Sequence, residues 1–283
     1  MPQRLLVCTD LDRTLLPNGF QPESPQARPL LRRLAEHPDV TLVYVSGRYL
    51  RSIEAAIQEY GLPLPDYAIG DVGTSIYRPA HGEWRLWEQW SQRIGADWHG
   101  HRREEIAGWL ADIEILAPQE AAKQNRFKLS YYTPADLDVD ELFAELQARL
   151  SARGVKATLV WSIDETTDTG LVDLLPPRAT KLSAVRFLMD ESGFEPRNTL
   201  FAGDSGNDLP VLVSGIPAVL VANATEEVRR AAIEACTASG TEDALYLAHG
   251  GFLGMNGNYA AGMLEGLAHF HPRFIPWLAD TQA

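Results

Sequence analysis

The chain has 283 residues, of which 45% are hydrophobic and 22% are charged, and its formal net charge is −13 at pH 7. This length suits one large domain or two ordinary ones, and the composition allows a sizeable buried core. The negative charge argues against a nucleic-acid binder or a membrane-surface protein, because both need a basic face. An anionic substrate would need local cations or a bound metal.

Cysteine usage and hydropathy bear on the cellular compartment. Cys8 lies in an apolar run and Cys236 in a helical stretch, so both are expected to be buried, reduced thiols. The sequence has no long apolar span, and the apolar run near the N-terminus is too short for a signal peptide. These features predict a cytoplasmic protein.

Short apolar runs alternate with amphipathic stretches in the first 80 residues and again after residue 180. The pattern predicts six strands and five helices in these two segments: strands at 5–8, 40–45, 67–69, 75–77, 199–202 and 218–221, and helices at 25–35, 53–61, 181–189, 225–235 and 260–269. A further helix is expected to start near Leu209. Strands separated by helices of this length imply right-handed crossovers and a parallel sheet.

The middle of the chain follows another pattern. It is rich in tryptophan, and it contains three predicted strands and one helix, at 127–132, 157–161, 171–174 and 139–153. We therefore expect an α/β protein with a Rossmann-like, doubly wound parallel sheet core from residues 1–79 and 178–283. An inserted α+β domain is expected at residues 80–177.

Five tryptophans cluster in the first part of this insertion, at positions 84, 87, 90, 98 and 109. Aromatic faces can stack on sugars. However, a stripe in which tryptophan recurs every three residues favours packing between the insertion and the core.

Three of the predicted strands end in polar clusters. Asp10 and Asp12 follow the first strand, residues 46–48 (Ser-Gly-Arg) follow the second, and residues 203–208 (GDSGND) follow a later one. Ligands of an open parallel sheet bind at the carboxyl ends of its strands, so these clusters are expected to converge on one crevice. Oxygen ligands suit Mg²⁺, and the crevice would contain four carboxylates: Asp10, Asp12, Asp204 and Asp208.

A phosphoryl-transfer site also needs groups that hold the phosphate and offset its charge. Ser46 and the backbone amides of its turn can bind phosphate oxygens. Lys181, which opens a predicted helix after Pro176 and Pro177, is the candidate cation. Together these residues predict a magnesium-dependent phosphoryl-transfer site.

The segments DLDRT, VSGR and GDSGND, with Lys181 at a helix start, resemble in order the four motifs of the haloacid dehalogenase (HAD) superfamily of phosphotransferases. The insertion lies where the type-two α/β cap of that superfamily belongs. The resemblance implies that Asp10 is the nucleophile, forming an aspartyl-phosphate, and that Asp12 is the general acid and base. It implies a Mg²⁺ site made by Asp10, the backbone carbonyl of Asp12 and Asp204, with Asp208 in support. Phosphate binding is implied for Thr14, Ser46, Gly47, Lys181 and Asn207.

A closer resemblance is to sucrose-phosphate phosphatases, and it is carried by residues 72–74 (Val-Gly-Thr), 127–131 (Phe-Lys-Leu-Ser-Tyr) and the terminal helix 260–265. It implies hydrolysis of sucrose 6-phosphate, and the candidate sugar contacts are Arg48, Gly73, Thr74, Lys128 and Ser130. The family usually has an acidic residue where this chain has Ser75, and the loop 250–259 is longer. Another glycosyl-sugar phosphate, such as mannosylfructose phosphate, therefore stays open as the substrate.

Two other functions are alternatives to a phosphatase: a phosphomutase and a non-catalytic partner of another enzyme. Superfamily members that keep a long-lived phospho-aspartate have threonine at the position of Asp12, so this residue argues for a phosphatase or a phosphomutase. The type of cap argues against a phosphomutase. The intact set of four motifs argues against a non-catalytic partner of a sugar-phosphate synthase. Such a synthase is nevertheless a candidate partner of an active phosphatase, and we expect a monomer or a small homo-oligomer.

Overall fold

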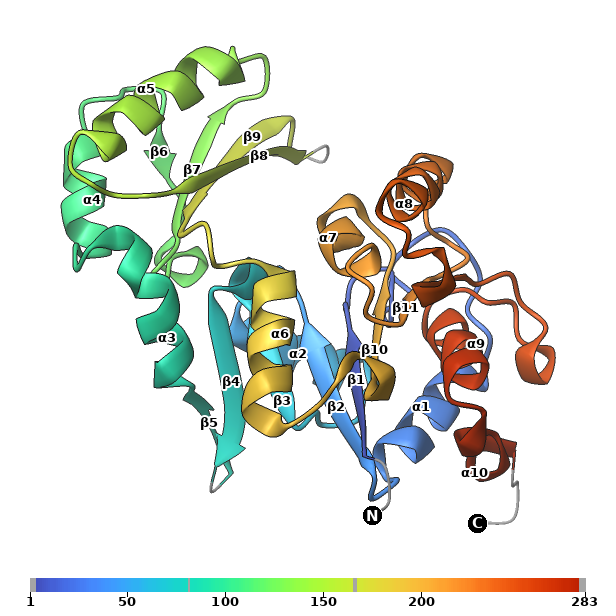
Figure 1. The fold of residues 1–283 in the computed structure, drawn as a ribbon. Coiled ribbons are helices and arrows are strands. Elements are labelled where there is room, and N and C mark those ends of the chain that lie inside the picture. The colour runs from blue at the N-terminus through green and yellow to red at the C-terminus, as the bar shows by residue number, and fades with distance from the viewer. Residues whose placement is uncertain (1–3, 81, 165–166, 280–283) are drawn as a thin grey trace.

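Two separate sheets organise the chain in the computed structural model, which describes residues 4–80, 82–164 and 167–279 (Figure 1). The strands of the larger sheet are β1 (Leu5–Thr9), β2 (Val40–Val45), β3 (Tyr67–Gly70), β4 (Ser75–Ala80), β5 (Glu83–Leu86), β10 (Thr199–Gly203), β11 (Ala218–Leu220) and β12 (Leu245–Leu247). Within the described residues their order is β12-β11-β10-β1-β2-β3-β4-β5. All neighbours from β12 to β3 pair in parallel, and β4 and β5 join antiparallel at the edge.

Helices cover both faces of the larger sheet. They are α1 (Ala27–Ala35), α2 (Leu50–Tyr60), α6 (Lys181–Ser192), α7 (Leu209–Leu212), α8 (Glu226–Ser239), α9 (Ala260–Phe270) and α10 (Ile275–Ala279). Side chains of β1 alternate between the faces: Leu6 and Cys8 pack with α6, α7 and α8, whereas Leu5 and Val7 pack with α1, α2 and α9. A central strand buried on both faces is typical of a doubly wound α/β sheet, and the predicted fold class is confirmed.

The order in which strands are added to the larger sheet reverses next to β1. From β1 the chain adds β2 and β3 on one side, and it later returns to add β10, β11 and β12 on the other. Ligands of such sheets bind outside the carboxyl ends of the strands at this switch point. The ends of β1 and β10 therefore mark the place for a site.

The smaller sheet lies within the predicted insertion. Its strands are β6 (Ala117–Pro118), β7 (Leu129–Pro134), β8 (Thr158–Asp164) and β9 (Thr169–Leu175), in the order β6-β7-β9-β8, all antiparallel. Three helices accompany it: α3 (Glu88–Gly95), α4 (Arg103–Leu110) and α5 (Val139–Ser151). Figure 1 shows α4 and α5 on the outer side of this sheet.

Several elements were not predicted from the sequence: β5, β6, β12, α3, α4 and α10. Most are short, and a two-residue strand such as β6 has no periodicity to detect. β5 lies after residue 80 and yet pairs with β4, so the expected boundary at residue 79 falls inside a hairpin of the larger sheet.

The tryptophan stripe joins the insertion to the core. Trp87 and Trp90 both contact Phe187 of α6, at ring centroid distances of 5.4 and 5.2 Å. The indole N–H of Trp90, which is 1% exposed, donates to the backbone carbonyl of Gly73 at 3.0 Å. The packing role predicted for this stripe is confirmed at these positions.

Two further expectations concern the thiols and the membrane. Cys8 and Cys236 are both buried and free. Among the described residues, no helix has the length and apolar character needed to cross a bilayer.

Candidate active site

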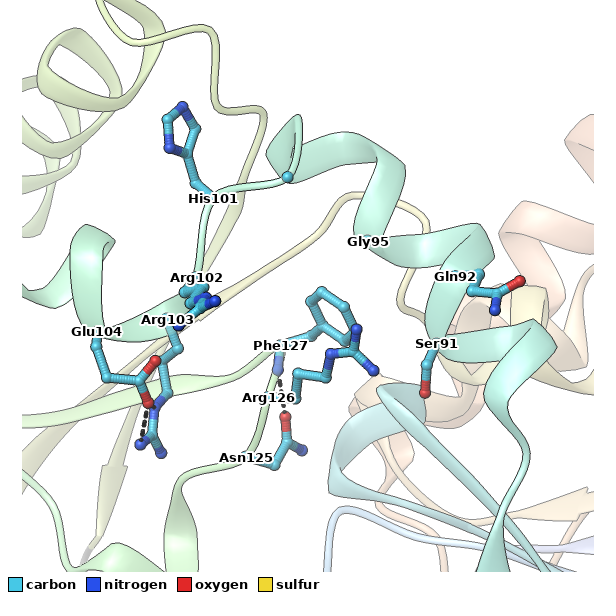
Figure 2. A pocket seen from close by; sticks show the side chains of 11 residues that line it. Ser91, Gln92, Gly95, His101, Arg102, Arg103, Glu104, Asn125, Arg126 and Phe127 are labelled. Atoms are coloured by element: carbon cyan, nitrogen blue, oxygen red, sulfur yellow. Dashed lines mark hydrogen bonds and ion pairs between the residues drawn. The ribbon is translucent and has the colours of Figure 1, made fainter.

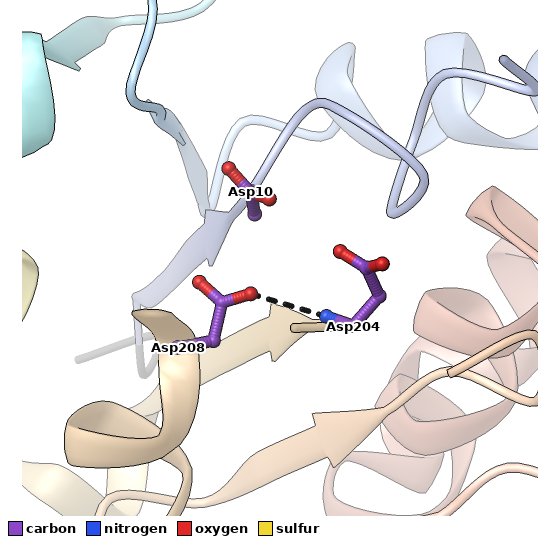
Figure 3. A group of neighbouring side chains, drawn as sticks. All are labelled: Asp10, Asp204 and Asp208. Carbon is purple, nitrogen blue, oxygen red and sulfur yellow. Dashed lines mark hydrogen bonds between the residues drawn. The ribbon is translucent and has the colours of Figure 1, made fainter. Parts of the chain in front are cut away.

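Three carboxylates meet where β1 and β10 end (Figure 3). Asp10 follows β1 and Asp204 follows β10, and the backbone N–H of Asp10 donates to Ala202 of the neighbouring strand at 2.9 Å. Asp208 lies on the next turn, where its carboxylate accepts from the backbone N–H groups of Asp204 and Ser205, both at 3.2 Å. All three acids are buried, and an oxygen of each lies within 4.8 Å of the others.

Lys181 supplies the positive charge beside these acids. It is the first residue of α6, which Thr180 caps by accepting from the backbone N–H of Ser183. Its ammonium group lies 2.7 Å from Asp208 and 3.0 Å from Asp10. Burial works to lower the pKa of Lys181, but the two carboxylates outweigh it and raise the pKa, so the side chain stays charged.

When ionised, the three carboxylates of Asp10, Asp204 and Asp208 carry more negative charge than the single ammonium group of Lys181 can offset. Burial raises the pKa of Asp10 to about 8, although Lys181 opposes the shift. Burial and the charge of Asp208 raise the pKa of Asp204 to about 6. Crowded, buried carboxylates that would otherwise retain protons are a suitable donor set for a hard divalent cation. The residues present therefore fit the predicted metal.

Asp12 is held in a different environment. Arg48 donates to both of its oxygens, at 2.8 and 2.6 Å, and the Asn18 amide donates at 2.7 Å. Burial works to raise the pKa of Asp12, but the hydrogen bonds and charge of Arg48 lower it below its usual range. In this structure Asp12 is therefore an anion that is paired with Arg48.

A hollow of about 460 Å³ opens above these groups. Larger-sheet residues form one wall, among them Asp10, Asp12, Arg48, Asp71, Asp204 and Asn207. Residues of the insertion form the other, among them Gln119, Lys123, Lys128, Leu171 and Asp173. The pocket thus brings several of the predicted phosphoryl-transfer residues together with polar side chains of the insertion.

Several candidates lie behind the pocket rather than along it. Thr14 is fully buried and its hydroxyl donates to Asp204 at 3.1 Å, so its contact is with an acid and not with the hollow. Ser46 is fully buried, whereas Gly47 and Arg48 of the same turn line the pocket. Gly73, Thr74 and Ser130 are also buried and are absent from its lining.

The lining residues that escaped the sequence interpretation include Asp71, Gln119, Lys123 and Asp173. Asp71 directly follows β3, just as Asp10 directly follows β1. Asp173 pairs in register with Ser130, and its carboxylate accepts from that hydroxyl. The available signal was a single charged residue, Asp173, within the otherwise apolar run 171–175.

A second hollow, of about 610 Å³, lies elsewhere in the insertion (Figure 2). Residues of α3, the start of α4 and the segment before β7 line it, among them Gln92, Arg102, Arg103, Asn125 and Arg126. None of the predicted site residues borders it, so it is separate from the carboxylate cluster.

Comparison with known families identifies the fold and chemistry. The model of the family described as sucrose-6F-phosphate phosphohydrolase matches residues 2–271. A protein of Nitrosococcus oceani described only as a HAD-like hydrolase is 55% identical over 98% of this chain and 75% of its own length. The mannosylfructose-phosphate phosphatase of Agrobacterium fabrum is 29% identical, over 95% of this chain and 97% of its own.

A plant relative and a solved structure are also similar to this chain, and both are described as sucrose-phosphatases. The chain is 31% identical to a probable sucrose-phosphatase of Arabidopsis thaliana, but it spans only about half (52%) of that protein. The X-ray structure of the sucrose-phosphatase from Synechocystis sp. PCC6803, in complex with sucrose and phosphate, superposes with a TM-score of 0.71. It is 28% identical, with 95% of this chain and 98% of that chain covered. This chain therefore belongs to the sucrose-6F-phosphate phosphohydrolase family of HAD-like phosphatases, and it is a phosphoric monoester hydrolase.

Proposed function

We propose that the protein hydrolyses sucrose 6-phosphate to sucrose and phosphate, in a Mg²⁺-dependent reaction that passes through an aspartyl-phosphate on Asp10. The observation that most supports this is the composition of the pocket. One hollow is lined by the buried acids Asp10 and Asp204, by the Asp12–Arg48 pair and by polar side chains of the insertion. This combination suits a phosphate on one side and a polyhydroxylated leaving group on the other.

In the first step, Asp10 attacks phosphorus in line as the bond from phosphorus to the sugar oxygen breaks. Lys181 and the backbone of Gly47 bind the phosphoryl oxygens and offset their charge. Asp12 donates a proton to the departing sugar oxygen. Because Arg48 holds Asp12 as an anion in this structure, the substrate has to draw Arg48 away before Asp12 is protonated.

In the second step, Asp12 is ionised again and takes a proton from water as the water attacks the aspartyl-phosphate. Phosphate leaves, and Asp10 regains its carboxylate. A single residue thus serves as acid and then as base, and its pKa has to respond to what occupies the pocket.

The metal would be held by Asp10, Asp204 and the backbone carbonyl of Asp12. When bound, Mg²⁺ would offset the charge of the phosphoryl oxygens. Asp208, which was also a candidate ligand, has its oxygens engaged by Lys181 and by the backbone of residues 204–205. We therefore assign Asp208 the task of orienting Lys181 and Asp204.

The insertion would select the sugar. We propose that residues 80–177 act as a cap over the core formed by 1–79 and 178–283, although β5 extends the core sheet. Lys123, Lys128 and Asp173 can exchange hydrogen bonds with sugar hydroxyls. The Synechocystis complex with sucrose supports sucrose as the leaving group. The second candidate, mannosylfructose phosphate, is favoured by the nearly full-length match to the Agrobacterium enzyme.

Phosphate release from a panel of sugar phosphates, with Mg²⁺ and with a chelator, tests this proposal. We expect the highest kcat/KM with sucrose 6-phosphate, no release with the chelator, and a loss of at least about 10³-fold in Asp10→Asn. The exposed Asp136→Asn is the matched control. Release from monosaccharide phosphates alone would contradict the disaccharide assignment, and no release from any of them would contradict the enzyme.

Partners and assembly remain predictions. We expect a column that carries an immobilised sugar-phosphate synthase to retain the purified chain. Light scattering would distinguish a monomer from a small homo-oligomer.

A further inference from the structure

Three consecutive residues after β3 adopt a left-handed backbone conformation. The φ angles of Asp71, Val72 and Gly73 are 51°, 61° and 98°. Glycine accepts this region readily, but a β-branched valine does so rarely, so the loop 71–73 is strained. Strain of this kind persists only where the surroundings enforce it, and it concentrates at functional sites.

The surroundings of this loop are two parts of the catalytic centre. The backbone N–H of Asp71 donates to the Arg48 carbonyl at 2.9 Å, and that of Val72 donates to the Ser46 carbonyl at 3.2 Å. Gly73 packs against the start of α6, where a Cβ atom on it would lie 2.9 Å from the backbone nitrogen of Lys181. The loop is therefore clamped between the turn that binds phosphate and the residue that offsets its charge.

The same loop also meets the insertion. The amide of Asn125 donates to the hydroxyl of Thr74 at 2.7 Å. Figure 2 shows Asn125 beside Phe127, whose backbone N–H donates to the Asn125 side chain at 2.8 Å. Thr74 in turn donates to the carbonyl of Asp71 at 3.0 Å. A chain of hydrogen bonds thus fixes Asp71 relative to the turn from Asn125 to Lys128, which immediately precedes β7.

Side-chain hydrogen bonds with Asn125 and Ser75 use part of the acceptor capacity of the Asp71 carboxylate, and a carboxylate has about four acceptor sites. The residue is 3% exposed, yet it lines the 460 Å³ pocket. Burial raises its pKa, and Lys128, Asn125 and Ser75 oppose the shift. Among the described residues no cation lies within ion-pairing distance of Asp71, because Lys128 instead pairs with Asp173 at 3.5 Å. A buried acceptor with spare lone pairs, next to a pocket, is suited to bind hydroxyl donors.

We propose that Asp71 is a specificity-determining residue of the core, whose carboxylate accepts a hydrogen bond from a hydroxyl of the sugar leaving group opposite Lys128 and Asp173. The inference rests on the proposed sugar phosphatase activity and adds a contact from the larger-sheet wall. The strained loop holds this acceptor at a fixed place between the phosphate turn and the insertion. A substrate without hydroxyl groups would gain nothing from it.

The test compares two substrates in one variant. For Asp71→Ala, which removes both acceptor oxygens, we expect kcat/KM for the best sugar phosphate to fall at least about tenfold more than kcat/KM for p-nitrophenyl phosphate. Most of that loss should lie in KM. Because both substrates use Asp10, the aryl phosphate reports in the same sample that the centre is folded. Asp136→Asn, an exposed change in the insertion, should leave the ratio at the wild-type value.

Either of two other results would overturn the inference. An equal loss on both substrates would mean that Asp71 only supports the loop, and an unchanged sugar phosphate kcat/KM would mean that no hydroxyl is bound there. Asp71→Ser is the second variant, and it should change the ratio in the same direction. Failure of the proposed function itself would look different, because the wild-type enzyme would then release no phosphate from any sugar phosphate.

Discussion

The two walls of the active-site pocket differ in how firmly their side chains are held. Directly behind the larger-sheet wall, Lys181 is 3% exposed and contacts two carboxylates and Asn207. On the insertion wall, the side chain of Lys123 is 44% exposed; it donates to the hydroxyl of Tyr132 at 2.8 Å and pairs with the exposed Glu120 at 3.4 Å. The groups that we propose to perform the chemistry are held in place in the absence of substrate, whereas the wall that we propose to contact the sugar includes a half-exposed side chain.

This contrast has a physical reason. Transition-state charge is best stabilised by groups that need no reorganisation, and such groups have to be buried and cross-linked. Recognition of a sugar needs only a correct set of donors and acceptors, and a half-exposed lysine can supply one of them. We therefore expect changes on the first wall to stop turnover and changes on the second to alter KM.

The largest effect is expected from Asp12→Asn. The variant lacks a group that can give and take a proton, so kcat should fall by about 10²–10⁴-fold in a phosphate release assay. Asp136→Asn serves as the control. Turnover at the wild-type rate would show that Asp12 is not the acid and base.

Lys181→Met should follow. It leaves Asp10 and Asp208 buried without a cation, so we expect kcat to fall about 10²-fold or more and the free energy of unfolding to fall by about 3 kcal/mol. Phosphate release and chemical denaturation measure the two effects. The exposed Lys156→Met is the matched control, and a stability equal to that of the wild type would contradict the account of the cluster.

A smaller effect concerns Mg²⁺ and pH. In the metal-free protein the pKa of Asp10 is raised from 3.8 to about 8, and that of Asp204 to about 6. The folded state therefore holds these protons more tightly than the unfolded chain does. This contribution to stability is complete below pH 3.8 and is lost as the pH rises towards 8.

Because Mg²⁺ competes with those protons, it should raise Tm more near pH 8 than near pH 5.5, by roughly 2–4 °C. Thermal melts with and without MgCl₂ measure the difference, and Asp204→Asn should reduce it. A Tm shift that is equal at the two pH values would exclude these acids as the metal ligands.

The smallest effect is expected on the insertion wall. Lys123→Ala removes one hydrogen-bond donor from the sugar side, so KM for the sugar phosphate should rise about threefold to tenfold with little change in kcat. Lys156→Ala is the control. A fall in kcat as large as that of Lys181→Met would show that the two walls do not divide the work.

The contrast between the walls also explains what could be predicted from the sequence. Asp10, Asp204 and Lys181 each lie at the end of a strand or the start of a helix in the parallel sheet, and the switch point of such a sheet brings them together by topology alone. Their convergence therefore follows from the order of elements, which the hydrophobic pattern indicates well.

The insertion wall depends on tertiary packing, which a single sequence does not encode locally. Lys123 lies in a short 3₁₀ turn, and it reaches the pocket only because the smaller sheet is held against the core. The direction in which single side chains point was also not predicted. Thr14 and Ser130 have the expected chemistry, but their hydroxyls donate to Asp204 and Asp173, behind the pocket lining. Sequence spacing identifies a face, and only packing decides which of its side chains line the pocket.

Transfer of the phosphoryl group to Asp10 can be observed by trapping the proposed intermediate. Asp12→Asn is mixed with sucrose 6-phosphate and Mg²⁺, quenched in acid, and mapped by peptide mass spectrometry. Because this variant hydrolyses the intermediate slowly, we predict a phosphoryl group on the peptide that contains Asp10. Phosphate release with the group on another residue, or with no modified peptide at any time of quenching, would contradict the account.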